Sequence, residues 1–200
     1  MLNIMDTILI QNDIQSARKQ GAEIVLVFFH YGSEYQTEPT EAEKFIVGKT
    51  KEFGADLIIG SHPHVLQPME LYKTSGAKLD TGVIAWSLGN FISNQKDRYC
   101  DVGVILNISL EKNFTKNKIK MTDVSYIPTW VYRGTNEEKK IHIIFPSEYY
   151  MKDSISNGKD SLPSFLNAES KAKMKQAFQD AKKILNRRSA QVKMKSVLKK

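Results

Sequence analysis

Hydrophobic positions in the first sixty residues predict the order helix, strand, helix, strand. Residues 3–20 carry isoleucine and alanine at roughly helical spacing and are predicted to form a helix. The run EIVLVFFH, residues 23–30, is continuously apolar, which predicts a strand buried on both faces. Thr40 and Glu43 match a capping box, which predicts a second helix over about 41–53. A second buried strand, ADLIIG, follows that helix.

The next segments are predicted to be rich in strands. The expected strands are 69–72, 83–88, 102–110 and 118–127. A turn around Ser75 and Gly76 is expected to join the first two, and a turn at 113–117 is expected to join the last two, which should be antiparallel. An α/β half followed by a sheet-rich half indicates the α/β class.

The character of the chain changes near residue 151. Residues 152–164 are polar and contain glycine and proline, which predicts a loop. The remainder has a helical composition, with a narrow apolar stripe formed by Met174, Phe178, Ala181 and Leu185. We therefore expect a domain over 1–150 and a basic linker with a tail helix over 151–200.

The net charge of +7 is unevenly distributed. Residues 1–150 hold 16 Lys and Arg against 18 Asp and Glu, a net charge of −2, whereas residues 151–200 hold 13 against 4, a net charge of +9. The body therefore gives no reason to expect a nucleic-acid partner. The tail could touch an anionic membrane surface, although a solvated surface helix is the more common outcome.

Several protein classes are disfavoured by composition. No run of eighteen apolar residues exists, so no transmembrane helix is predicted. The first residues lack the basic segment of a secretory signal. Cys100 is the single cysteine, which excludes an intrachain disulfide and a cysteine metal cluster.

Three of the four histidines follow the first two predicted strands. His30 ends one strand, and His62 and His64 come directly after the next. If these strands are parallel neighbours, the three imidazoles meet at the carboxyl edge of the sheet, where α/β proteins bind ligands. Imidazole suits zinc, iron and manganese, so the pattern predicts a metal site. Packing or hydrogen-bonding roles are the alternative, and Gly32 and Gly60 are either tight-turn residues beneath the site or ordinary loop glycines.

Two further polar residues are candidates for the same edge. Glu34 could orient an imidazole, act as a general base, contact a substrate or be a solvated loop carboxylate. Asn90, at another strand end, could bind a ligand or cap a turn. Cys100 and His142 are expected to be structural.

Three motifs together resemble the CapA family. They are HYGSEY at 30–35, GADLIIGSHPHVLQP at 54–68 and AWSLGNFI at 85–92. Over about residues 3–130 the chain is similar to these bacterial capsule synthesis proteins of the poly-γ-glutamate type (PGA_cap). The Gly-Ser-His-Pro-His element also resembles the final motif of calcineurin-like metallophosphoesterases, whose fold the family shares. The resemblance implies a four-layer α/β/β/α metallophosphoesterase-like sandwich.

The resemblance also implies roles for individual residues. His30, His62 and His64 correspond to metal ligands, with His30 and His62 facing one ion and His64 facing a second. The ion is divalent (Mn, Zn, Fe or Mg), polarises a phosphoryl oxygen and lowers the pKa of a bound water. Glu34 and His62 are the catalytic candidates, and Glu34, Tyr35 and Asn90 are the candidates for substrate binding.

The chain also departs from the family pattern. A Gly-Asp motif on a first strand and a later Asn-Asn-His-type motif are both missing from the sequence. The resemblance therefore implies the C-terminal part of a CapA-like protein, from a split or truncated gene or a wrong start. The carboxylate that bridges two ions would come from the missing N-terminal half, so the site is expected to be incomplete and a sheet edge is expected to be exposed.

Three functional hypotheses follow. The first is a part in synthesis or export of a capsule polymer, with hydrolase activity if the missing half completes the site. The second is a non-catalytic assembly subunit of a membrane-associated capsule synthesis complex. The third is a phosphoesterase completed by another chain. The expected partners are the capsule polymer or its precursor and membrane-bound capsule synthesis proteins. Family resemblance implies the outer face of the membrane, whereas the chain as it stands predicts a cytoplasmic protein.

Overall fold

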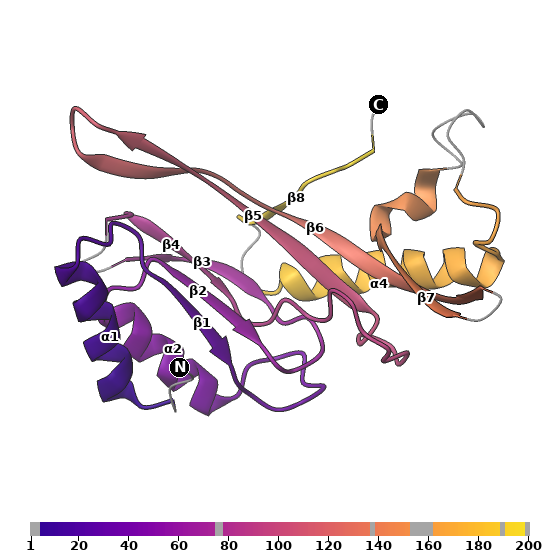
Figure 1. The fold of residues 1–200 in the computed structure, drawn as a ribbon, viewed down its shortest axis with the longest axis horizontal. Coiled ribbons are helices and arrows are strands. Elements are labelled where there is room, and N and C mark those ends of the chain that lie inside the picture. Colours follow the sequence, from indigo (N-terminus) through magenta and orange to yellow (C-terminus); the bar gives the residue numbers. More distant parts are fainter. Residues whose placement is uncertain (1–4, 75–77, 137–138, 153–161, 189–190, 199–200) are drawn as a thin grey trace.

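A computed structural model describes residues 5–74, 78–136, 139–152, 162–188 and 191–198 (Figure 1). The predicted turn at Ser75 and Gly76 and most of the predicted loop over 152–164 lie outside the described residues.

The first half of the chain forms a four-stranded sheet with two helices. Its elements are α1 (Thr7–Lys19), β1 (Leu26–His30), α2 (Glu41–Glu52), β2 (Leu57–Ser61), β3 (Met69–Lys73) and β4 (Thr81–Ala85). The strand order is β1-β2-β4-β3, with β1, β2 and β4 parallel and β3 antiparallel to β4. The predicted order of helices and strands is therefore confirmed, and the first two strands are parallel neighbours.

Side-chain caps fix where the two helices begin. The Asp6 carboxylate accepts hydrogen bonds from the backbone N–H groups of Ile8 and Leu9 at the start of α1. The predicted capping box of α2 is present, because Thr40 Oγ1 accepts from the Glu43 N–H and the Glu43 carboxylate accepts from the Thr40 N–H. These caps satisfy backbone donors that have no partner within the helix.

The second half forms another sheet and a long helix. Its elements are β5 (Val102–Asn113), β6 (Lys118–Asn136), β7 (Lys139–Pro146), the 3-10 helix η1 (Ser147–Met151), α4 (Ala168–Leu185) and β8 (Lys193–Met194). Strands β5, β6 and β7 are antiparallel in that order, and β8 pairs with β6 in parallel. The sequence predicted β5 and part of β6, but it missed β7 and β8. None of the described helices is long and apolar enough to cross a bilayer.

The first sheet lies between helices α1 and α2 on one face and the second sheet on the other (Figure 1). Ile58 and Ile84 pack on the helix side. Leu57 and Val83 pack toward β5 and β6. The α/β class is confirmed.

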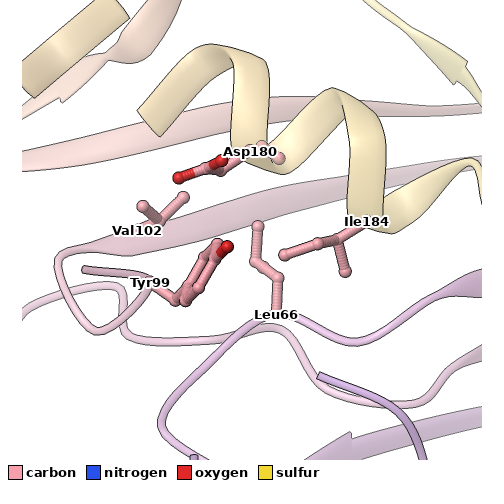
Figure 2. A pocket seen from close by; sticks show the side chains of 6 residues that line it. Leu66, Tyr99, Val102, Asp180 and Ile184 are labelled. Carbon is pink, nitrogen blue, oxygen red and sulfur yellow. The ribbon is translucent and has the colours of Figure 1, made fainter. Parts of the chain in front are cut away.

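Helix α4 is packed into the same core as the two sheets. The apolar stripe predicted for the tail (Met174, Phe178, Ala181 and Leu185) is buried. Ile184 faces Leu66 and Val102 across a small recess that has no room for a water molecule (Figure 2). The helix therefore contacts both the loop after β2 and the second sheet, whereas the domain boundary near residue 150 stays a prediction.

The prediction that the first strand is buried on both faces is wrong. β1 is the edge strand of its sheet, and the side chains of Leu26 and Phe28 are 54% and 59% exposed. They point to the same side as Leu57 and Ile59 of the adjacent strand. The second sheet covers Leu57 and Ile59 and leaves β1 uncovered on that side. Among the described strands β1 pairs with β2 only, so its outer edge has no strand partner there.

Candidate functional site

The chain takes an unusual backbone path directly after β2. His62 and His64 have positive φ angles of 103° and 60°, on either side of the buried Pro63. Tyr35, in the loop after β1, has φ 64°, and its N–H donates to the Pro63 carbonyl at 2.8 Å. Positive φ costs free energy in residues other than glycine and is concentrated at functional sites. The two loops therefore hold each other in a strained conformation that aims the two histidines.

Gly60 permits a close approach within this edge of the sheet. A Cβ atom at this position would collide with the Trp86 carbonyl and the Tyr31 ring. Gly60 lies inside β2 and allows the close packing of Trp86 and Tyr31 against this strand. The sequence had suggested a glycine in a tight turn, which is not its position. Gly32 has φ 95° and does match a turn glycine.

His30 and His62 lie against each other at the carboxyl ends of the two parallel strands. His30 pairs with Ser61 in the strand register. Its Nε2 is 3.0 Å from His62 Nδ1, and the two rings meet edge-on with centroids 4.8 Å apart. Two imidazole nitrogens bound to one ion at about 2.1 Å lie about 3.0–3.4 Å apart. This 3.0 Å contact is a hydrogen bond between the two rings, and its length also falls within the range for two ligands of a single ion.

His64 is oriented by Asn90. The amide nitrogen of Asn90 donates to the carbonyl oxygens of His64 and Cys100 and to Gln95 Oε1, at 2.8–3.1 Å. This fixes the amide orientation, so Asn90 Oδ1 faces His64 Nδ1 at 3.1 Å and accepts a hydrogen bond from it. His64 Nε2 lies on the other side of the ring, 3.7 Å from Glu34 Oε1. The sequence did not foresee this hydrogen bond to a site histidine, and ligand binding by Asn90 stays a prediction.

Tyr35 completes the group on the solvent side. Its ring stacks on His64 with centroids 6.2 Å apart, and its hydroxyl accepts a hydrogen bond from Gln95 Nε2 at 3.2 Å. The negative charge of Glu34 raises the pKa of the Tyr35 hydroxyl. Sequence reasoning missed Gln95, because a glutamine in a polar loop carries no distinctive signal.

Cys100 and His142 lie apart from these contacts. Cys100 is buried, and burial raises the pKa of its thiol, so it is a poor nucleophile. His142 is on β7, paired with Arg133 of β6.

The three histidines meet at one sheet edge, as the parallel strands require. The rings of His62 and His64 are tilted against each other, with centroids 6.0 Å apart. In the part of the chain that the structure describes, no group of three or more His, Cys, Asp and Glu side chains is arranged to hold an ion. The described residues therefore offer an ion two imidazole nitrogens, those of His30 and His62, with His64 and Glu34 beside them.

The fold and site define an α/β protein with a histidine cluster at the ends of parallel strands. Residues 4–95 match the model of the bacterial capsule synthesis protein family PGA_cap, and this region contains every candidate site residue named above. This match covers a little under half of the chain and, together with two curated relatives, supports the assignment of this region to the CapA family of the resemblance.

Two curated relatives show the same similarity. The chain is 36% identical over 100 residues to the PGA biosynthesis protein CapA of Bacillus subtilis (strain 168), covering 50% of this chain and 24% of that protein. It is 38% identical over 78 residues to the capsule biosynthesis protein CapA of Bacillus anthracis, covering 39% of this chain and 17% of that protein. The aligned region thus spans a quarter or less of each relative.

Proposed function

We propose that this chain takes part in the synthesis or export of a capsule polymer of the poly-γ-glutamate type, using a divalent metal site at the ends of β1 and β2. Both named relatives are capsule or PGA biosynthesis proteins, which supports the capsule role. The observation that carries the metal site is the 3.0 Å approach of His30 Nε2 and His62 Nδ1 between two adjacent strand ends.

In this proposal His30 and His62 hold the ion, and His64 lies beside it with its Nε2 3.7 Å from Glu34 Oε1. When bound, the ion would polarise a phosphoryl oxygen and lower the pKa of a water. Glu34 can accept a proton or a hydrogen bond beside His64, as a general base requires. The Tyr35 hydroxyl, held by Gln95, can donate to an anionic oxygen of a substrate.

A second candidate is a non-catalytic assembly subunit. It is favoured by the lack of a three-ligand group among the described residues and by the exposed apolar edge of β1. In this case the chain would act through its surface in a membrane-associated complex, and the histidine cluster would bind no ion. The two candidates differ in metal binding, which can be measured directly.

We expect the purified chain to bind one zinc or manganese ion in titration calorimetry. His30→Ala and His62→Gly should each abolish measurable binding, because each removes one member of the pair. Glycine is chosen at position 62 because it adopts the positive φ angle there without strain. His142→Ala, which removes an imidazole on β7, is the matched control and should bind as the wild type does.

The second candidate, a non-catalytic assembly subunit, predicts a folded chain that binds no ion. Circular dichroism would first establish that each variant is folded. A folded wild-type chain that binds neither ion would exclude the metal site in this chain. Equal loss in His142→Ala and His62→Gly would show that the binding is nonspecific.

A further inference from the structure

The loop after β1, residues 31–40, carries two of the site residues and needs to be held in place. Tyr35 is hydrogen-bonded to the Pro63 carbonyl, and the Gln67 side chain donates to the Gln36 carbonyl at 2.9 Å. These bonds attach the inner side of the loop to the histidine segment. Glu34 itself is half-exposed, so its position depends on how the rest of the loop is fixed.

The outer side of this loop is bound by two arginines that follow α4. Arg187 Nη1 donates to three acceptors on two consecutive residues: Thr37 O at 3.3 Å, Thr37 Oγ1 at 3.1 Å and Glu38 Oε1 at 2.8 Å. Arg188 donates to the other oxygen of Glu38 at 3.3 Å, and its guanidinium lies over the Trp86 ring, 5.5 Å from the centroid. A planar guanidinium suits both kinds of contact.

The arginine pair, Arg187 and Arg188, is fixed at its own end. Ile184 and Leu185 in the last turn of α4 are fully buried, and the Arg187 N–H donates to the Ile184 carbonyl at 3.2 Å. An isolated surface ion pair contributes little, since ordering two mobile side chains offsets the attraction. Here the backbone that carries the arginines is already ordered, and the Glu38 carboxylate accepts hydrogen bonds from both guanidinium groups. Less conformational freedom is therefore lost when these ion pairs form.

Helix α4 also contacts the second loop of the site. The Arg98 guanidinium forms a two-point ion pair with Asp180 of α4, with N–O distances of 3.0 and 2.8 Å. Arg98 belongs to the same loop as Gln95, which holds both Asn90 and Tyr35. Helix α4 and the two arginines that follow it therefore contact both loops beside His64, although this part of the chain lies outside the region that matches the family model.

We propose that Arg187 and Arg188 are positioning residues of the site: through Glu38 and Thr37 they hold the loop that places Glu34 and Tyr35 beside His64. The expected effect of the two arginines on ion binding rests on the proposed metal function. The effect on the loop itself can be measured without any ion.

The test compares Arg187→Ala/Arg188→Ala with Lys182→Ala/Lys183→Ala, which removes the same charge from the exposed side of α4. Hydrogen exchange by mass spectrometry reports the loop directly. In the arginine variant we expect faster exchange in peptides covering 31–40, with protection of α4 unchanged. Its zinc affinity should fall about tenfold, the usual size of an effect on residues that orient ligands, because the Tyr35 N–H of this loop holds the carbonyl of Pro63, the residue next to His62. The lysine variant should match the wild type in both measurements.

A partner variant, Glu38→Gln, tests the same contact from the loop side if the arginine variant fails to fold. Unchanged exchange in 31–40 would overturn the inference. Faster exchange with unchanged zinc affinity would also overturn it, because the loop would then have no influence on the site. Faster exchange in a protein whose wild type binds no zinc would support loop positioning and reject the proposed metal function instead.

Discussion

Replacement of Asp56 with alanine should lower the free energy of unfolding by about 3–5 kcal/mol, the range found when one partner of a buried ion pair is removed. Asp56 is fully buried, and its carboxylate accepts from Arg18 Nη2 at 2.5 Å, from the Val25 N–H at 2.7 Å and from the Leu79 N–H at 3.3 Å. Alanine would leave a guanidinium and two backbone donors without this acceptor. Urea denaturation followed by circular dichroism measures the change.

The control for this prediction is Asp80→Ala, which removes an exposed carboxylate close to the same region. Exposed substitutions of this kind change stability by no more than about 0.5 kcal/mol. Asp56→Asn should fall between the two, since it keeps an acceptor and loses the charge. If Asp56→Ala unfolds at the same urea concentration as Asp80→Ala, the buried carboxylate does not organise this part of the fold.

Two adjacent phenylalanines of β1 should respond very differently to alanine. Phe29 is 6% exposed and stacks on Tyr31 with ring centroids 5.2 Å apart, so Phe29→Ala should cost about 3–5 kcal/mol. Phe28 is 59% exposed on the uncovered face, so Phe28→Ala should cost less than about 1 kcal/mol. The same urea titration compares the pair. Equal losses would contradict the placement of β1 at the edge.

These phenylalanines show where prediction from sequence fails. The run EIVLVFFH has no alternation of polar and apolar residues, so it indicates burial on both faces. Whether a strand lies at the edge of a sheet depends on which other segments pair with it. Among the described strands β1 pairs with β2 and with no other strand, and the second sheet does not cover its face. Leu26 and Phe28 are exposed for these two reasons.

Local signals performed better. The capping box of Thr40 and Glu43 is confirmed because its hydrogen bonds span only three residues. The meeting of His30 and His62 could be predicted because two consecutive strands joined by a helix are usually parallel neighbours. The metal that these histidines were predicted to bind stays a prediction.

Long-range contacts could not be predicted. Arg187 meets Thr37 across 150 positions of the chain, and nothing near either residue signals the other. In the sequence Asp56 is one polar residue at the start of an apolar strand, and in the structure it joins Arg18 to the segment around Leu79. Such contacts follow from how the elements pack, which the pattern of a single sequence does not specify.

The central claim, that His30 and His62 share one divalent ion, is tested most directly by locating the ion. Crystals soaked with zinc would be measured at the zinc absorption edge. The account predicts an anomalous peak about 2.1 Å from both His30 Nε2 and His62 Nδ1, the usual length of a zinc–imidazole bond. A fully determined structure with no peak there, or with zinc bound only at other surface sites, would contradict it.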